Sequence, residues 1–142
     1  PDRDAVLARI ATFGLEDAIV APGFASADLL QQSLARALCL VLPSRREGYG
    51  LIVVEAAALG VPSVVVAGSD NAATELIEDG INGVVAESTE ELADAITRVH
   101  AAGAALRDST ARWYRLHAAE LSLEHSVELV SRLLPRGAGA HD

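Results

Sequence analysis

One stretch, residues 37–67, constrains the fold of this chain more than any other part of the sequence. It contains an apolar run, a charged turn with glycines, an Ala-rich segment and a β-branched run, at 37–42, 43–49, 50–59 and 63–67. Short apolar runs are typical of buried strands, and the Ala-rich segment is typical of a helix. Gly60 and Pro62 end that helix, because glycine favours helix termination and proline cannot continue a helix. The stretch therefore predicts strand, turn, helix and strand.

The rest of the chain continues this alternation. Strands are expected at 18–21 and 83–86, and helices at 2–13, 26–36, 72–78, 88–100, 107–121 and 123–134. Ser26 is expected to cap the second helix, and Ser88 with Glu91 to form a capping box at the start of another. Alternating strands and helices imply right-handed crossovers. We therefore predict an α/β fold, a Rossmann-like mainly parallel sheet flanked by helices.

Length and composition narrow the class of protein. The 142 residues fit one domain, which we place at 1–134, followed by a Gly/Ala-rich flexible tail at 135–142. The net charge of −9 argues against nucleic acid as a partner. A single cysteine, Cys39, in an apolar run is typical of a buried thiol in the cytoplasm, and no signal peptide or membrane span is evident. The four histidines are scattered and predict no metal site, while Trp113 has the spacing of a packing residue.

Two loops follow expected strands and would lie at the same edge of the sheet, where ligands bind in this fold class. The first contains Gly48 and Gly50 on either side of Tyr49, immediately before the expected helix. Glycines let a ligand approach the backbone, and the first amides of a helix attract anions such as phosphate. The alternative is that these glycines serve only a tight turn between strand and helix. The second loop, 68–71, ends in Asn71.

Two glutamates stand at either end of this turn and helix. Glu55 lies among apolar residues, where a carboxylate needs donors that ligand hydroxyls could supply. Alternatively, water or the neighbouring Arg45 and Arg46 satisfy it on a helix face. Glu47 would project into the same ligand-binding edge of the sheet, here called the rim. Alternatively, its carboxylate is stabilised simply by its place near a helix N-terminus. The two arginines could assist in binding a diphosphate, although solvated surface arginines are the more common case.

These residues resemble the E-x7-E motif of retaining glycosyltransferases, and more narrowly glycosyltransferase family four, which has the two-domain GT-B fold. The resemblance covers roughly residues 2–100 in order. It rests on the segments Pro43-Ser44, Glu47-Gly48-Tyr49-Gly50-Leu51, Glu55-Ala56, Gly60-Val61-Pro62, Thr74-Glu75-Leu76-Ile77, Asp79-Gly80 and Asn82-Gly83. It implies that the chain is the C-terminal, donor-binding part of a larger enzyme that transfers a hexose from a nucleoside diphosphate with retention.

The resemblance also implies roles for individual residues. Glu47 would be the catalytic residue facing the donor sugar, and Glu55 would bind the ribose. The segment Gly48, Tyr49, Gly50 and Leu51 would contact the sugar and the diphosphate, and Gly23 with Phe24 would lie near the base. Asn71 and Glu75 are candidates to touch the donor sugar, although Asn71 could instead cap the helix that follows it.

The sequence departs from the family in two respects. A basic Gly-Arg-Lys segment that grips the diphosphate has no match, and an N-terminal acceptor domain would lie outside this chain. Partners are therefore expected to include a nucleotide sugar and that acceptor domain, with no metal or other cofactor. Either the strands at 18–21 and 37–42 pair directly, or an apolar sheet edge remains that favours self-association.

Two rival functions stay open at this stage. One is a stand-alone binding or interaction module without transferase activity. The other is a sugar-nucleotide epimerase with a GT-B fold, which the glutamate spacing disfavours. The intact enzyme is expected in the cytoplasm, and attachment to a membrane surface is left open.

Overall fold

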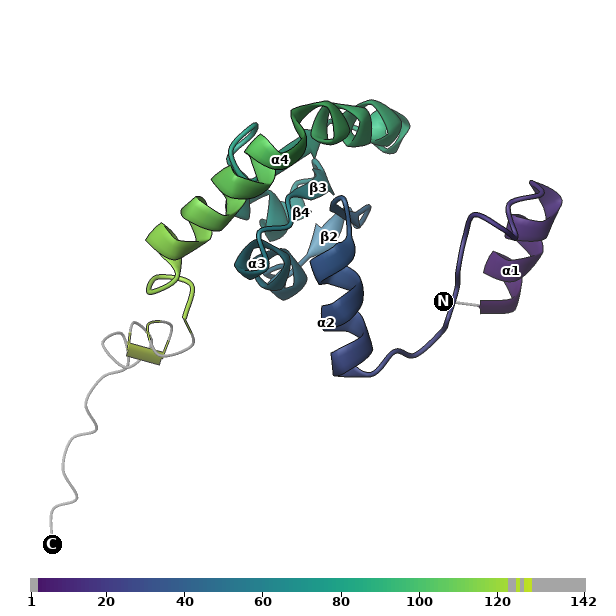
Figure 1. The fold of residues 1–142 in the computed structure, drawn as a ribbon, viewed down its shortest axis with the longest axis horizontal. Coiled ribbons are helices and arrows are strands. Elements are labelled where there is room, and N and C mark those ends of the chain that lie inside the picture. The colour runs from purple at the N-terminus through teal and green to yellow at the C-terminus, as the bar shows by residue number, and fades with distance from the viewer. Residues whose placement is uncertain (1–2, 123–124, 126, 129–142) are drawn as a thin grey trace, which may run out of the picture. The chain divides into compact units, whose positions relative to one another are not determined.

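A computed structural model describes residues 3–122, 125 and 127–128 of the chain. The chain forms two units, Pro1–Ser33 and Leu34–Asp142, which are described separately here (Figure 1). The predicted helix at 123–134 lies largely outside the described residues, and the predicted tail at 135–142 lies wholly outside them.

The first unit contains helix α1 (Arg3–Thr12), which ends at Gly14 with a positive φ of 63°, as the sequence predicts. The predicted strand at 18–21 is wrong. Its residues form a turn and an irregular segment, in which the amides of Ala18 and Ile19 both donate to the carbonyl of Leu15. A strand requires hydrogen bonds to a neighbouring strand, and no described strand pairs with this segment. Val20 is consequently 86% exposed.

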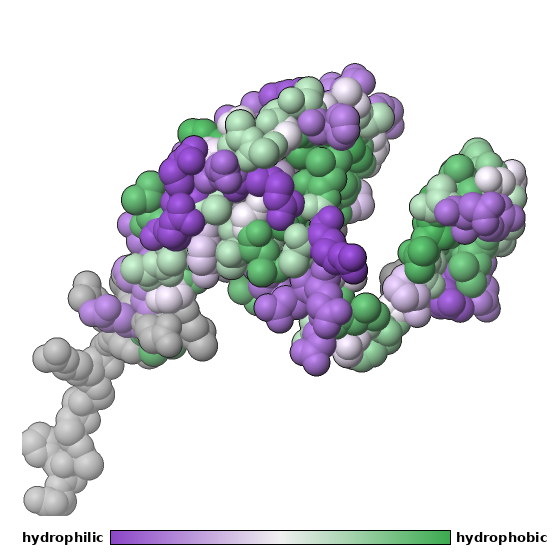
Figure 2. All heavy atoms as spheres, viewed as in Figure 1, coloured by the Kyte–Doolittle hydropathy of each residue, from purple (hydrophilic) through white to green (hydrophobic). Residues whose placement is uncertain are grey.

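Apolar side chains are gathered on part of the visible surface of this first unit (Figure 2). They surround a groove of about 260 Å³, lined by Val6, Arg9, Ile10, Phe13, Leu15 and Ile19. Phe13 and Ile19 are 64% and 44% exposed. Helix α2 (Ala27–Arg36) then leads into the second unit, and its N-terminus is capped as predicted, because the Leu29 amide donates to the Ser26 hydroxyl at 3.3 Å.

The second unit is built on a three-stranded parallel sheet with the order β1-β3-β5. The strands are β1 (Leu40–Leu42), β3 (Ser63–Val66) and β5 (Gly83–Ala86). The central strand β3 is fully buried, which confirms the β-branched run as core. Gly83 is required beside it, since a Cβ at this position would lie 2.1 Å from the carbonyl oxygen of Ser63.

Strand β1 differs from its prediction. It begins at Leu40 rather than at Ala37, and its residues are half-buried rather than buried on both faces. The reason is its place at the edge of the sheet, where among the described residues only β3 pairs with it. Direct pairing with 18–21 is therefore wrong. Cys39, just before β1, is half-buried, and this burial raises the pKa of its thiol.

Helices cover both faces of this sheet (Figure 1). On one face Val64 packs in a cluster with Val99 and Leu106 of α4 (Leu92–His117). On the other face Val65 packs with Val53 of α3 (Leu51–Ala58). Successive strand residues point to opposite faces, so the apolar run of β3 supplies both clusters. This arrangement matches the predicted fold class.

The two helices expected at 88–100 and 107–121 form as the two parts of α4, on either side of a non-helical break at Gly103. Two local predictions need correction. Residues 72–78 were expected to form a helix, but only the 3-10 helix η1 (Ala72–Leu76) forms. The capping box does not form before the 3-10 helix η2 (Thr89–Glu91), because Ser88 caps no amide. The Ser88 hydroxyl instead hydrogen-bonds to Glu90 and lowers the pKa of that carboxyl.

The loops at the carboxyl ends of β1 and β3 also contain structure that the sequence did not predict. Strand β2 (Arg46–Glu47) and strand β4 (Asp70–Asn71) pair in parallel, Arg46 with Asp70 and Glu47 with Asn71. These two short strands join the loop after β1 to the loop after β3. Among the described residues, no helix is both long and apolar enough to cross a lipid bilayer.

Candidate functional site

A cleft of about 620 Å³ opens between the loops that follow β1 and β3. Its lining comes from two stretches of chain, residues 46–48 and residues 68–75 except 73. Both loops follow the carboxyl ends of parallel strands, as the sequence predicted for the ligand-binding rim. The candidate site is therefore this cleft.

Asn71 holds the two sides of the cleft together. Its amide nitrogen donates to the carbonyls of Ser44 and Val66, at 2.8 and 2.7 Å. Its side-chain oxygen accepts from the amide of Ala73 at 3.1 Å, which caps η1. The side chain is buried and both amide hydrogens are in use. Of the two interpretations left open by the sequence, the structure favours capping over contact with a sugar.

Glycines allow the same loops to approach closely. A Cβ on Gly68 would lie 2.6 Å from the carbonyl oxygen of Arg45, and one on Gly50 would lie 2.7 Å from the Cβ of Ala73. Gly50 also has a positive φ of 85°. Close packing and the positive φ therefore explain why position 50 is a glycine. This agrees with the alternative that the glycine serves a tight turn between strand and helix. Gly48 is different, since a Cβ there would meet nothing within 4 Å. It lines the cleft, so its missing side chain leaves space for a ligand.

Glu47 is placed in the cleft as predicted. It is half-buried in β2, with its backbone held in register opposite Asn71. Arg46, its neighbour, also lines the cleft, but its side chain is 86% exposed and lies 3.6 Å from the carboxylate of Asp70. Glu75 lines the opposite side on η1 and is exposed. The cleft thus contains carboxylates on both sides and one guanidinium.

Glu55 does not have the surroundings that the sequence suggested. It is exposed on α3, because Val53, Ala56 and Ala57 occupy the buried face of this helix. A solvated carboxylate needs no other partner here, so the inference from apolar neighbours was wrong. Glu55 is outside the lining of the cleft, as are Tyr49 and Leu51, which are 43% and 67% exposed.

The remaining candidates are placed as follows. Gly23 and Phe24 belong to the first unit, where Gly23 has a φ of 79° and Phe24 is fully exposed. Trp113 is buried on α4, as predicted for a packing residue, and His117 and His125 are half-buried. Within the described residues, no three His, Cys, Asp or Glu side chains form a group that could hold a metal ion.

Sequence reasoning did not identify Asp70 or Ala72 as lining residues, nor the pairing of β2 with β4. Two-residue strands leave no periodic pattern, and their pairing depends on a loop contact across 24 positions, from Arg46 to Asp70. The position of loop 68–71 after a buried strand was the available signal. It identified the correct rim but not the individual side chains.

The helix N-terminus beside the cleft has the features of an anion site. Helix α3 begins after Gly50 and has no side-chain cap. The first amides of a helix have no intrahelical partner, and the helix dipole adds partial positive charge there. The same turn carries Gly48 and Glu47 into the cleft. An acid, open backbone and helix N-terminus therefore occur within one short segment.

Comparison with known proteins identifies a family that matches this chain. A family described as "Glycosyl transferases group 1" matches residues 1–102. An alpha-D-kanosaminyltransferase of Streptomyces kanamyceticus is 35% identical over 88 residues, which cover 61% of this chain and 22% of the relative. The chain thus spans about a fifth of that relative's length.

Solved structures agree on the fold. The crystal structure of Anabaena Alr3699/HepE in complex with UDP matches with a TM-score of 0.73 and 24% identity, over 90% of this chain and 36% of that one. The same protein in complex with UDP-glucose matches with a TM-score of 0.72 and 23% identity. These matches confirm the predicted fold, a sheet flanked by helices that corresponds to part of a GT-B structure. The chain belongs to the group 1 glycosyltransferase family.

Proposed function

We propose that this chain binds the donor of a retaining glycosyltransferase, which transfers a hexose from a nucleoside diphosphate to an acceptor. The observation that carries the proposal is the cleft itself. There the half-buried Glu47 and the open backbone at Gly48 lie at the carboxyl ends of parallel strands, next to the N-terminus of α3. Family membership supports glycosyl transfer as the reaction class. Retention is part of the proposal and follows the E-x7-E spacing.

The diphosphate is assigned to the N-terminus of α3. The uncapped first turn offers backbone amides and a favourable dipole, and Arg46 adds a cationic side chain at the cleft. Departure of the nucleoside diphosphate develops negative charge, which such preorganised dipoles stabilise. No metal is required in this scheme, although basic groups from outside this chain would strengthen the binding of the diphosphate.

The sugar is assigned to the cleft. Glu47 faces it from β2, and its half-buried carboxylate can stabilise positive charge at the reacting carbon or accept hydrogen bonds from sugar hydroxyls. Glu75 on η1 supplies further acceptors from the opposite side. Asn71 acts through the loops that it joins and is not assigned a sugar contact.

The nucleoside is assigned to residues outside the cleft lining. Glu55 lies four residues after Leu51, one turn along α3, and its exposed carboxylate is free to accept from ribose hydroxyls. Structures of Anabaena Alr3699/HepE contain UDP and UDP-glucose, so these two compounds are the first probes for this protein. The acceptor is assigned to parts of the protein beyond this chain.

The binding role is tested by calorimetry with UDP on the full-length protein. Glu55→Ala is expected to weaken binding about tenfold or more, because a lost hydrogen bond to a charged group contributes about 1.5–3 kcal/mol. Asp108→Ala is the matched control, since Asp108 is an exposed acid on α4 away from the cleft. Equal affinity of Glu55→Ala and the control would remove the ribose role.

The catalytic role is tested by transfer from UDP-glucose or another nucleotide sugar. Glu47→Ala is expected to keep most of the donor affinity and to lose transfer by a factor of about 10² or more, as when one transition-state contact is removed. Full turnover in this variant would end the assignment. The anomeric configuration of the product, read by NMR, tests retention. UDP binding without transfer to any acceptor would favour a binding module instead.

A further inference from the structure

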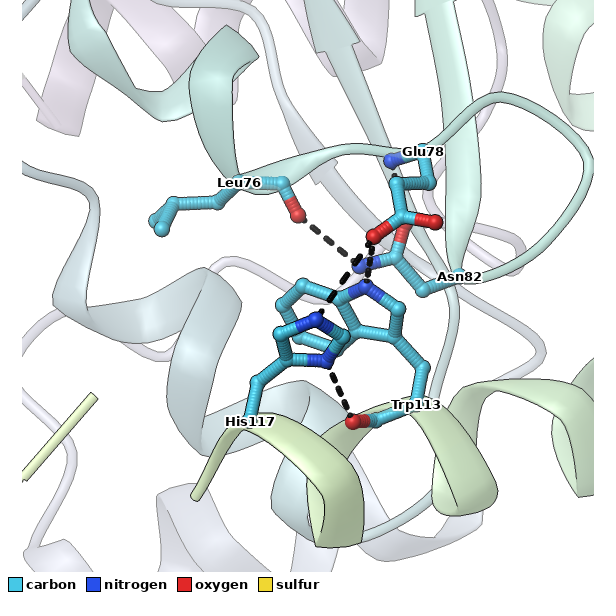
Figure 3. A network of polar contacts seen from close by, with 5 residues as sticks. All are labelled: Leu76, Glu78, Asn82, Trp113 and His117. Atoms are coloured by element: carbon cyan, nitrogen blue, oxygen red, sulfur yellow. Dashed lines mark hydrogen bonds and ion pairs between the residues drawn. The ribbon is translucent and has the colours of Figure 1, made fainter. Parts of the chain in front are cut away.

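Two adjacent acids in the second unit, Glu78 and Asp79, are each bound by a side chain from α4. The indole nitrogen of Trp113 donates to Oε1 of Glu78 at 2.5 Å (Figure 3). The guanidinium of Arg98 donates to Oδ2 of Asp79 at 2.8 Å. These four residues are named the α4 clasp.

The two α4 residues of the clasp lie on either side of the kink. Arg98 precedes Gly103 and Trp113 follows it, and in a straight helix residues 15 positions apart would be separated by about 22 Å. The bend shortens this separation, and both side chains contact neighbouring residues of one turn. Gly103 departs from helical geometry with φ 55° and ψ −136°, a conformation that favours glycine. The bend is visible in Figure 1.

The bound segment also contains hydrogen bonds of its own and leads directly to the cleft. The buried side chain of Asn82 accepts from the amide of Glu78 and donates to the carbonyl of Leu76, both at 2.8 Å (Figure 3). Leu76 is the last residue of η1, whose Thr74 and Glu75 line the cleft. A displacement at Glu78 would therefore reach the cleft through a short, hydrogen-bonded stretch.

The two halves of the clasp differ in strength. Arg98 and Asp79 are 57% and 52% exposed, and exposed ion pairs contribute little. Trp113 is only 7% exposed, so the donor of the hydrogen bond to Glu78 is shielded from water, while the Glu78 side chain is 49% exposed. His117 supports the indole, with ring centroids 4.8 Å apart, its Nδ1 2.9 Å from the Trp113 carbonyl and its Nε2 4.0 Å from the Glu78 carboxylate. The Trp113–Glu78 half is thus the stronger one.

We propose that Trp113 and Glu78 are positioning residues for the cleft. They fix the segment 76–82 and thereby the η1 wall that presents Thr74 and Glu75. The effect on a donor rests on the proposed function, whereas the effect on the wall does not. A packing role alone would change stability without a selective change at this wall.

The first experiment measures amide hydrogen exchange by mass spectrometry on the full-length protein without ligand. Trp113→Phe keeps an aromatic ring but removes the N–H donor, and Glu78→Ala removes the acceptor from the other side. Each is expected to accelerate exchange in peptides covering 72–82 about tenfold, with β3 unchanged, because local opening follows the lost hydrogen bond. Glu78→Gln keeps an acceptor oxygen and is expected to restore most of the protection. Unchanged exchange at 72–82 in both variants would overturn the clasp.

The second experiment compares KM for the donor with kcat. Trp113→Phe and Glu78→Ala are expected to raise KM about tenfold with kcat within about twofold, and the double variant no more than either single change. Val99→Ala is the control, since it removes core volume against the sheet without removing a hydrogen-bond donor or acceptor of the clasp. It is expected to lower Tm without changing KM.

The outcomes separate the two proposals. Faster exchange at 72–82 with an unchanged KM would overturn the link between clasp and cleft. An equal rise of KM in Val99→Ala would overturn it also, because general destabilisation would then explain the effect. A wild-type protein that neither binds nor uses nucleotide sugars would refute the proposed function, while the exchange experiment would still decide whether the clasp orders the wall.

Discussion

Glu47 and Glu55, which are separated by seven residues, lie in different regions of the second unit. Glu47 is half-buried in β2, at a rim held by contacts between residues far apart in sequence, such as Asn71 with Ser44. Glu55 is exposed on α3, where local helical geometry determines its position. Substitutions that remove the contacts between the two loops of the rim should therefore strongly change the position of Glu47 and the stability of the cleft. Substitutions around Glu55 should change only the binding of a ligand by Glu55 itself.

The most severe way to disturb the rim is Asn71→Ala. It removes three hydrogen bonds and leaves the carbonyls of Ser44 and Val66 and the amide of Ala73 without this partner. The expected loss is about 2–4 kcal/mol of the free energy of unfolding, because each buried polar group left unpaired costs about 1–3 kcal/mol. Urea unfolding monitored by circular dichroism provides the measurement.

Asn71→Asp is the companion variant. It keeps an oxygen for the Ala73 amide but places a carboxylate against two carbonyls, so it should be no more stable than Asn71→Ala. A loss below about 0.5 kcal/mol for Asn71→Ala, the range of ordinary surface changes, would show that the rim does not depend on this side chain.

Two glycines of the same turn provide a matched pair. Gly50→Ala should cost about 1–3 kcal/mol, because it introduces a clash with Ala73 and a side chain at a φ of 85°. Gly48→Ala should stay within about 0.5 kcal/mol, since nothing lies near the new methyl group. Thermal unfolding of both variants tests this, and similar losses for the two would refute the distinction between a packing glycine and a cleft glycine.

The ion pair of Arg46 and Asp70 allows a test of whether charge contributes to the stability of the rim. Their side chains are 86% and 65% exposed at a distance of 3.6 Å, so Arg46→Gln should lower stability by less than about 1 kcal/mol. The difference from the wild type should shrink further in high salt. Denaturant unfolding at low and high ionic strength measures both values. A large loss that is insensitive to salt would mean that the pair is structurally important.

Glu55→Ala should have the smallest effect on stability. The residue is exposed on a helix, and alanine has the higher helix propensity, so the free energy of unfolding should change by less than about 0.5 kcal/mol. Calorimetric unfolding of this variant therefore determines whether weaker UDP binding reflects a lost contact. A drop in stability comparable to that of Gly50→Ala would show that Glu55, like the residues of the rim, is needed for stability.

Much of the site could be predicted from local patterns. The buried run at 63–66, the helix ended by Gly60 and the carboxyl-end rim all follow from hydrophobic periodicity and from residues that terminate helices. The placement of Glu47 in the cleft also followed, because the residue immediately precedes a glycine turn at that rim. The strand expected at 18–21 failed, since an apolar run forms a strand only where a partner strand is present.

By itself, the sequence determined the order of the elements, the buried central strand and the segment that contains the site. Only the tertiary structure decided that Asn71 is a structural link, that Gly50 serves packing while Gly48 faces the cleft, and that Glu55 is exposed. It also decided that one kinked helix binds two adjacent acids. The physical reason is the separation along the sequence. Helix and strand patterns arise between near neighbours in sequence, whereas these contacts join loops and helices that are distant along the chain.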